Sequence, residues 1–462
     1  GRRRVKRALF VAFHFAPENV SGTHRSLHFA RCLVDRGIYV RVLTRSVSSI
    51  ARLDRSLEHV FPWPDRIVRV APGDTRLDRF VDWLRPPAGG SLAAGSNGER
   101  EDRAATADDS AVARRAAGDS SSRRFGKLRG FVDWALRFPD EHKGWYEPAL
   151  VAGRQILDGD PFDLVFASGP PWTGIRVGAA LAREGGIPFV ADYRDPWTRR
   201  SGRTWTVGGP IFDLLGAHLE DRVIRDAEMV IANSPGIRDG IRSGHPTLTD
   251  SRLETIVNGS NARRRESARH FPKPGPIAAR HFGSLYAKRK IGPLLAAAVR
   301  RNEDAERWRV EQYGPDPGPE YIGSLPGPAR ELFALFDPLP FHDAVQRMHE
   351  PGLLVMIQPA LLSRQVPTKL FDYLCTGNPV LLLASEHSSA WVIARRFERC
   401  FRADPDDVDG ILRILVALEA RRAAGELMQV PTADDTRRLS KESIGQEFTS
   451  TVERVLRRSQ SP

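Results

Sequence analysis

Short apolar runs alternate with amphipathic segments along most of this 462-residue chain. Residues 8–13 form an apolar run, and residues 23–36 follow with apolar side chains three or four positions apart, the spacing of one helix face. Gly37 stands where that periodicity stops, and a second apolar run occupies residues 39–43. The pattern predicts a strand, a helix and a second strand, in this order.

The alternation continues through two long regions of the chain. In the first region we predict strands at residues 164–167, 189–191, 229–232 and 253–256, and helices at residues 172–184, 211–226 and 235–243. In the second region we predict strands at residues 280–282, 309–312, 353–357 and 380–383, and helices at residues 293–301, 342–349, 368–374 and 405–418. Strands that alternate with helices indicate a parallel sheet covered on both faces, so the chain carries this α/β pattern twice.

Two breaks in the pattern divide the chain. Residues 85–124 contain no aromatic side chain and are rich in Ala, Gly, Ser, Asp and Arg, so they bury too little apolar surface to offset their ordering entropy. We predict a mobile insertion there and a linker at residues 261–276. The first domain then covers residues 1–260 and the second covers residues 277–436. An amphipathic helix within residues 437–462 is expected to pack back on the first domain.

Composition narrows the class of protein without choosing its partner. Apolar residues make up 41% of the chain, and the net charge of +12 favours anionic partners, namely phosphates, nucleic acid or an acidic membrane surface. We give this charge little weight, because many Arg residues stand beside Ala and Gly as a compositional habit. No apolar run reaches the roughly 18–20 residues that span a bilayer, and residues 8–13 are too short for a signal-peptide core. The three cysteines are Cys32, Cys375 and Cys400, and their spacing matches neither a zinc site nor a disulfide framework. This fits a reducing, cytoplasmic compartment.

Ligands of open parallel sheets bind where the carboxyl ends of strands lead into helices, so these loops are the candidate sites. In the first loop, Gly22 stands just before a helix for which Thr23 is the expected N-cap. A glycine there lets the backbone approach a bulky ligand and leaves the helix N-terminus open to an anion. An ordinary turn followed by a capped helix is the alternative.

A second loop places two carboxylates around an arginine directly after a predicted strand. Asp192 and Asp195 flank Arg194, so that one carboxylate can orient an acceptor hydroxyl while Arg194 holds the other. The alternative is a structural Arg–Asp pair that stiffens the loop. A metal ion at the two carboxylates lacks a visible third ligand.

Two loops of the second domain suit phosphate groups. After Gly283 and Ser284, the cations Arg289 and Lys290 stand close to a helix start and match a diphosphate, unless they form an ordinary solvated basic loop.

In the other loop, the N–H groups of residues 368–370 are expected to be open to a phosphate, with Thr368 at the helix start and Lys369 adding charge. Asp372 lies one turn further on the same helix face, where it can accept both hydroxyls of a ribose. A capped helix with a Lys–Asp pair has the same pattern. We interpret residues 404–407 as a helix cap around Asp404 rather than a metal site, and the scattered histidines as surface or core residues.

Together and in this order, these segments resemble the retaining glycosyltransferases of family 4, of the bacterial surface-polysaccharide type, which have the GT-B fold. The resemblance covers roughly residues 5–260 and 277–420. It is carried by residues 13–18 (FHFAPE), 22–25 (GTHR), 191–197 (ADYRDPW), 235–236 (PG), 257–259 (VNG), 283–286 (GSLY) and 368–374 (TKLFDYL).

The resemblance implies two Rossmann-like domains whose parallel sheets face each other across a cleft, with the acceptor in the first and a nucleotide-diphosphate sugar in the second. It implies that Arg194 and Asp195 lie near the reacting sugar and that no metal or other cofactor is needed. The residues implied in donor binding are Gly22, Gly283, Ser284, Arg289, Lys290, Thr368, Lys369 and Asp372.

Three departures from the family pattern bear on the substrate. Ser284 stands where many relatives carry Arg, which moves the diphosphate role to Arg289 or Lys290. The family's pair of glutamates eight positions apart is replaced by Arg364 and Asp372. These changes leave open which sugar is used and how active the protein is.

The resemblance implies a hexosyltransferase-like reaction in cell-surface polysaccharide or glycoconjugate biosynthesis. Front-face attack would retain configuration, and the leaving phosphate would take the acceptor proton. The acceptor would be lipid-linked or another glycan, and the basic surface would dock at an anionic membrane. One alternative is a GT-B-fold sugar-nucleotide epimerase, which needs acid and base residues in the first-domain loops. The other is a non-catalytic basic protein that binds membrane or nucleic acid, although a basic stripe interleaved with aromatics is missing.

Overall fold

The structure is a computed structural model that divides into two compact units. It describes residues 4–73, 138–199, 202–203, 210–260, 262, 266–267, 269–270, 275–303, 307–428 and 430–459. One unit combines Gly1–Val257 with Gly445–Pro462, and the other is Asn258–Ile444. The insertion predicted at residues 85–124 and most of the linker predicted at residues 261–276 lie outside the described residues.

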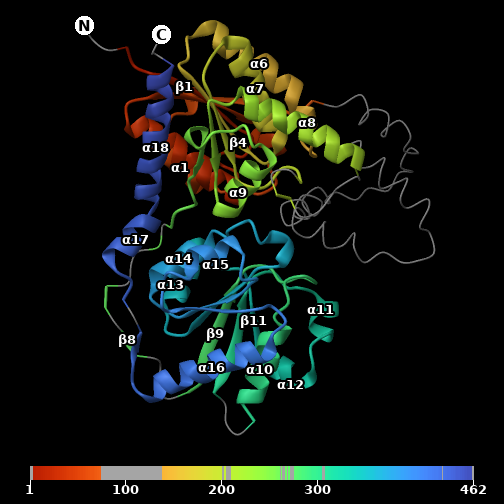
Figure 1. Cartoon of the computed structure of the whole chain (residues 1–462), viewed down its shortest axis with the longest axis vertical. Coiled ribbons are helices and arrows are strands. Elements are labelled where there is room, and N and C mark those ends of the chain that lie inside the picture. Colours follow the sequence, from red (N-terminus) through yellow and green to blue (C-terminus); the bar gives the residue numbers. More distant parts are fainter. Residues whose placement is uncertain are drawn as a thin grey trace, which may run out of the picture. The chain divides into compact units, whose positions relative to one another are not determined.

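The first unit is built on a seven-stranded parallel sheet (Figure 1). The strands follow the order β3 (Ile67–Val70), β2 (Tyr39–Arg45), β1 (Arg7–Ala12), β4 (Leu164–Gly169), β5 (Phe189–Tyr193), β6 (Met229–Ala232) and β7 (Leu253–Thr255). Its helices are α1 (Ser21–Asp35), α6 (Tyr146–Gly159), α7 (Trp172–Gly185), α8 (Pro210–Asp226), α9 (Pro235–Gly244) and α18 (Lys441–Arg458), whose first turn belongs to the second unit.

The central strands of this sheet are apolar on both faces because helices cover both. Leu9 and Val11 of β1 join the core that α6 and α7 complete. Side chains of a strand alternate between faces, so Phe10 points the other way. There it stacks on Phe166 of β4, with ring centroids 4.4 Å apart. The continuous apolar run in the sequence therefore reflects a strand buried on both sides.

The second unit repeats the architecture with a six-stranded parallel sheet. Its strands follow the order β11 (Phe333–Phe336), β10 (Trp308–Tyr313), β9 (Ile277–Phe282), β12 (Leu353–Ile357), β13 (Val380–Leu383) and β14 (Cys400–Ala403). A two-stranded antiparallel ribbon pairs β8 (Arg269–His270) with β15 (Leu427–Met428). Its helices are α10 (Gly292–Arg301), α11 (Pro319–Gly323), α12 (Gly327–Glu331), α13 (Phe341–His349), α14 (Lys369–Thr376), α15 (Ser389–Ala394), α16 (Val408–Ala423) and α17 (Ala433–Leu439).

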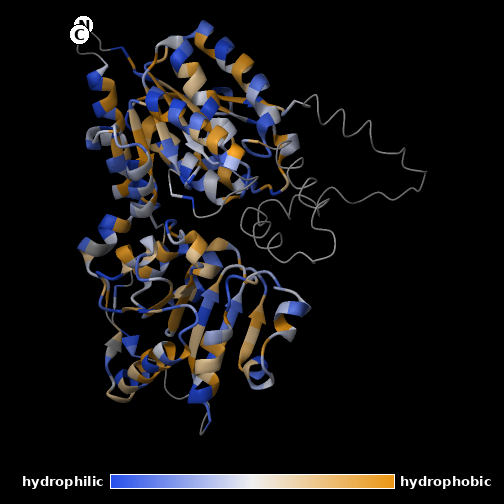
Figure 2. Ribbon diagram, turned by 45° about the vertical axis from the view of Figure 1, so that its right-hand side comes forward, coloured by the Kyte–Doolittle hydropathy of each residue, from blue (hydrophilic) through white to orange (hydrophobic). Residues whose placement is uncertain are grey.

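Many residues on the strands and helices of both units are hydrophobic (Figure 2). In the second unit, α10 and α16 cover one face, where Ile277, Val310 and Val355 join their core. The α/β fold class predicted from the alternation of strands and helices is thus confirmed for both halves of the chain.

The C-terminal helix α18 packs on the first unit through an aromatic cluster. The ring of Phe448 lies parallel to that of Phe29 in α1 at 4.0 Å and meets Phe166 edge-on at 5.4 Å. The hydroxyl of Thr451 donates to Glu254 at 2.6 Å. These contacts place the last helix of the chain beside the first.

Several local predictions need correction. Helix α1 begins at Ser21 with Val20 as N-cap, so Gly22 lies in its first turn and Thr23 does not cap it. Helix α16 is capped by Asp407, whose carboxylate accepts from Gly410 N, rather than by Asp404. The helix predicted from residue 437 is two helices interrupted at residue 440.

The sequence pattern also missed β3, α6, β11 and β14. The three strands among them have four residues each and lie at sheet edges. Four residues are too few for an alternation of apolar and polar positions to be recognised.

Replacing Phe448 with Ala should destabilise the first unit. The ring is fully buried against two other rings, and large-to-small changes of a buried Phe cost about 3–5 kcal/mol. The measurement is urea unfolding followed by fluorescence. Val416→Ala, at an exposed position of α16, is the control and should change little. A Phe448 variant as stable as this control would show that α18 is not part of the first unit's core.

Candidate functional site

A buried ion pair organises the carboxyl edge of the first sheet. Asp192 near the end of β5 is completely buried and accepts three hydrogen bonds from the Arg25 guanidinium, the shortest at 2.8 Å. The hydroxyl of Ser168 in β4 donates to the same carboxylate at 2.7 Å. A buried carboxylate needs such partners, because desolvation is otherwise unfavourable. The prediction that Arg194 holds one of the two carboxylates does not apply to Asp192, because Arg25 holds it.

Gly22 and Arg194 come together although they are far apart in the sequence. A Cβ atom placed on Gly22 would lie only 1.7 Å from the Arg194 guanidinium, so the missing side chain makes room for this cation. Burial lowers the pKa of Arg194, and the charges of Asp195 and Asp192 oppose that effect. Two of the predicted motifs thus meet in one place, with Asp195 electrostatically coupled to the arginine.

The same edge holds a histidine–glutamate pair that sequence reasoning missed. His14 Nδ1 and Glu18 Oε2 are 2.9 Å apart, and Arg45 donates to the other oxygen of Glu18. The lack of metal-ligand spacing predicts surface or core histidines, and this interpretation overlooks the pair. The signal in the sequence was the carboxylate four positions after a histidine, in a loop directly after the first strand.

In the second unit, Lys369 and Arg289 gather beside Gly283. Lys369 Nζ lies 3.8 Å from the position that a Cβ atom on Gly283 would take. Desolvation lowers the pKa of Lys369, and the positive charge of Arg289 lowers it further. Arg289 also donates to the carbonyl of Ser284 at 3.3 Å, which holds the cation against the loop that carries Gly283.

A buried relay fixes the backbone of this loop. His281 Nδ1 lies 2.5 Å from Gln312 Oε1, and the amide of Gln312 donates to the carbonyl of Gly283. Gly314 packs against the same carbonyl so closely that a side chain there would overlap it. Burial, with smaller contributions from Arg289 and Lys369, lowers the pKa of His281 to about 3, although its bond to Gln312 opposes this. The positive charge beside Gly283 therefore belongs to Arg289 and Lys369, while the imidazole stays neutral.

Lys290 does not share this arrangement. Its ammonium lies 3.6 Å from the carboxylate of Asp406, and both side chains are exposed. The prediction left Arg289 and Lys290 as alternatives for the diphosphate, and only the former is coupled to Lys369 in the structure.

Helix α14 presents a different pattern from the predicted one. It begins at Lys369, after Thr368, and the N–H of Leu370 donates to the carbonyl of Pro367 at 3.0 Å. The expectation that the Leu370 N–H is open to a phosphate is therefore wrong. Gly377 ends the helix in the left-handed conformation, as its position predicted.

Asp372 of α14 is buried and already has a partner. Its carboxylate accepts from the hydroxyl of Ser260 at 2.6 Å. Ser260 in turn donates through its N–H to Leu439 and accepts from the N–H of Lys441. Burial raises the pKa of Asp372, and the Ser260 bond and Lys441 offset this only in part. In this arrangement the carboxylate ties α14 to the segments around Ser260 and Lys441, and the ribose contact stays a prediction.

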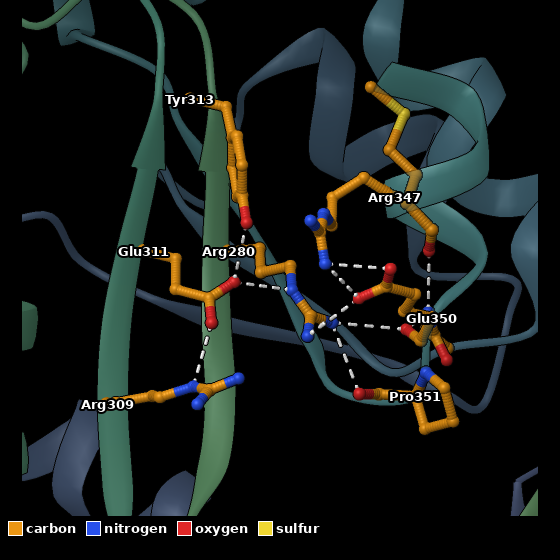
Figure 3. A network of polar contacts seen from close by, with 9 residues as sticks. Arg280, Arg309, Glu311, Tyr313, Arg347, Glu350 and Pro351 are labelled. Carbon is orange, nitrogen blue, oxygen red and sulfur yellow. Dashed lines mark hydrogen bonds and ion pairs between the residues drawn. The ribbon is translucent and has the colours of Figure 1, made fainter. Parts of the chain in front are cut away.

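A separate network of ion pairs and hydrogen bonds is centred on Arg280 in the second sheet (Figure 3). Arg280 of β9 donates to Glu311 of β10 at 2.7 Å and to the carbonyls of Glu350 and Pro351 at 3.2 Å. Tyr313 donates to the same Glu311 carboxylate. Arg280 alternates with His281 along β9, so the network lies on the sheet face opposite His281 and ties β9 to β10 and to the segment before β12.

The described residues were also compared with the requirements of a metal site and of a membrane-spanning helix. Among them, no group of three or more His, Cys, Asp or Glu side chains is arranged to hold a metal ion. Within the same part of the chain, no helix combines the length and the apolar content that crossing a bilayer requires.

Replacing Asp372 with Asn tests how burial affects this carboxylate. The pKa is raised in the folded state, so stability is lost as the pH rises from the ordinary value of 3.8 through the raised value. The amide removes this loss and still accepts a hydrogen bond from Ser260. We expect the melting temperature of the variant, relative to the unsubstituted protein, to rise across this pH range. Asp406→Asn, at an exposed carboxylate, is the control. A difference that does not change with pH would contradict the expectation.

Comparison with known proteins adds the family. The model of the glycosyl transferase 4-like domain matches residues 22–259, more than half of the chain. No curated protein sequence is significantly similar to this chain.

Solved structures share the fold at low identity. HepE from Anabaena, crystallised with UDP-glucose, is 12% identical with a TM-score of 0.58, over 97% of this chain and 99% of its own. Sucrose-phosphate synthase from Thermosynechococcus elongatus is 12% identical with a TM-score of 0.61, over 98% and 99%. The lipopolysaccharide outer core galactosyltransferase WaaB is 10% identical with a TM-score of 0.53, over 96% and 99%. The chain belongs to the glycosyl transferase 4-like family and is a glycosyltransferase of the GT-B fold class.

Proposed function

We propose that this glycosyltransferase moves a hexose from a nucleoside-diphosphate sugar to a hydroxyl acceptor with retention of configuration. The observation that carries the proposal is the pair of cations, Arg289 and Lys369, beside Gly283 at the carboxyl edge of the second sheet. Cations held against a backbone without a side chain suit a diphosphate. The complex of HepE with UDP-glucose, in a protein of the same fold, supports this class of donor.

The proposed chemistry is cleavage of the bond between the sugar and the diphosphate. Negative charge builds on the departing diphosphate, and cations already held in place stabilise it without reorganising. The buried relay from His281 through Gln312 to Gly283 supplies that rigidity. Ser284 and Thr368 would add polar contacts to the donor. In the first unit, Arg194 beside Gly22 and the nearby Asp195 would act close to the reacting sugar. No step calls for a metal or another cofactor.

We place the reaction in the synthesis of cell-surface polysaccharide or glycoconjugate, with a lipid-linked or other glycan acceptor. The net charge of +12 supports docking at the anionic inner face of a membrane. Sedimentation with vesicles tests this part: binding that needs acidic lipid and weakens with salt is expected, and equal recovery with neutral vesicles would contradict it.

A panel of uridine-, guanosine- and thymidine-diphospho sugars tests the donor class. A ligand that binds the folded state raises the melting temperature by mass action, so one base and one sugar should give the largest shift. The product formed from that donor is then analysed by NMR, where the anomeric coupling reports retention or inversion. The absence of any shift across the panel would overturn the proposal.

Lys369→Ala should weaken transition-state binding by about 1.5–3 kcal/mol, the usual loss for a hydrogen bond to a charged group. This corresponds to about a 10- to 150-fold loss in kcat/KM. Lys290→Ala removes an equal charge that is paired with exposed Asp406, so its loss should be much smaller. Equal losses in the two variants would show that overall charge, rather than the site beside Gly283, matters.

A sugar-nucleotide epimerase is the second candidate, because the His14–Glu18 pair supplies an acid and base group in a first-domain loop. Incubation with donor alone separates the two functions. An epimerase converts the donor to a different sugar nucleotide, whereas a transferase at most hydrolyses it slowly.

A further inference from the structure

His14 and Glu18 form a pair at the carboxyl edge of the first sheet, the edge where open parallel sheets bind ligands. His14 follows β1 by two residues, and Glu18 is held in the same loop. The Glu18 side chain is 4% exposed, whereas that of His14 is 20% exposed. The carboxylate is therefore sealed inside the protein while the imidazole remains accessible to a molecule from solvent.

Hydrogen bonding decides which ring nitrogen of His14 carries the proton. An ionised carboxylate only accepts, and the oxygens of Glu18 receive bonds from His14 Nδ1 and from Arg45. Burial acts to raise the pKa of Glu18, but the bonds to His14 and Arg45 outweigh it and bring the pKa below its ordinary value. Glu18 is thus ionised, His14 is protonated at Nδ1, and Nε2 keeps a lone pair. Among the described residues, none donates a hydrogen bond to Nε2.

The charged groups around His14 keep it neutral near pH 7. Burial lowers its pKa, Glu18 opposes this, and the cations Arg194 and Arg45 lower it further. The ring of His142, 6.2 Å away, has its own pKa lowered to about 3 and adds no charge. A neutral imidazole oriented by a buried carboxylate is the arrangement of a general base.

We propose that Nε2 of His14 binds the hydroxyl of the acceptor and takes its proton during transfer. This rests on the proposed transfer from a nucleotide sugar. As the acceptor oxygen bonds to the anomeric carbon, the bond from that carbon to the diphosphate breaks, and its electron pair leaves with the diphosphate. The acceptor attacks on the face from which the diphosphate leaves, so configuration is retained. The hydroxyl proton passes to Nε2 and not to the leaving phosphate, which departs from what the family resemblance implies, and Glu18 stabilises the imidazolium. The proton then leaves to the solvent, which restores the neutral ring.

The ligand class follows from the same geometry. A neutral nitrogen with a lone pair accepts a hydrogen bond from a hydroxyl group, but it has no proton to donate to a phosphate oxygen. His281 of the second unit shows the contrast, because it is 2% exposed and serves to hold Gln312. The accessible edge of His14, close to Arg194 and hence to Gly22, therefore fits the acceptor and not the donor.

Replacement of His14 by Asn, with Gln as a second variant, tests the proposal in the full-length protein. The rate of transfer should fall at least about 100-fold, the usual contribution of a general base. The thermal shift given by the preferred donor should stay unchanged. His218→Asn, an exposed histidine of α8, is the matched control and should transfer normally. Normal transfer by both His14 variants would overturn the proposal, whereas a missing thermal shift in the unsubstituted protein would instead overturn the proposed donor.

The pH dependence of transfer separates proton transfer from a structural role. His14 is active when neutral, so the rate should fall as the pH drops through its pKa, which lies below 6.5. Glu18→Gln keeps a hydrogen-bond acceptor but removes the charge that raises this pKa. The acid limb of the profile should therefore move to lower pH, with a lower plateau. An acid limb that stays in place in Glu18→Gln, or that persists in His14→Asn, would show that another group titrates.

Discussion

The buried pair of Arg25 and Asp192 is the interaction on which the first unit's polar edge depends. Arg25 lies one turn after Gly22 in α1, and Asp192 lies two residues before Arg194 at the end of β5. Arg25 also donates to the carbonyl of Ile256 at 2.8 Å, beyond the end of β7. One guanidinium thus sets three segments against each other. Because a buried charge that loses its partner is strongly unfavourable, this register is well determined, and it brings Arg194 onto Gly22.

In the second unit, neutral groups fix the loop beside which the cations lie. The relay from His281 through Gln312 holds the Gly283 carbonyl, while Gly314 leaves no room for that carbonyl to move. The cations Arg289 and Lys369 can then share a small region despite their repulsion, since their positions follow from a fixed loop and a helix start. Two cations that repel each other are well suited to an anion, because its negative charge offsets the repulsion.

Particular residues show how far sequence reasoning reached. Apolar periodicity located most strands to within a few residues, and β12 and β13 fall where the pattern placed them. Gly22 lies beside Arg194 and Gly283 beside Lys369, although the sequence named these residues in separate motifs, and their roles remain proposals. The sequence gives no sign that Arg25 is the partner of Asp192, because the two residues lie 167 positions apart. The His14–Glu18 pair was overlooked, because a histidine and a carboxylate four positions apart in a loop have no predictable orientation.

The sequence alone was sufficient to determine the two α/β halves, the candidate loops and the family, because these depend on local periodicity and on the order of short motifs. Only the tertiary structure decided which charges meet. Burial and hydrogen bonding assign Arg25 to Asp192 and Ser260 to Asp372, and an exposed ion pair joins Asp406 to Lys290, across separations of 112 to 167 positions in the chain. The reason is physical: the free energy of a charge depends on its distance to other charges and on its desolvation, and both arise only when distant segments pack together.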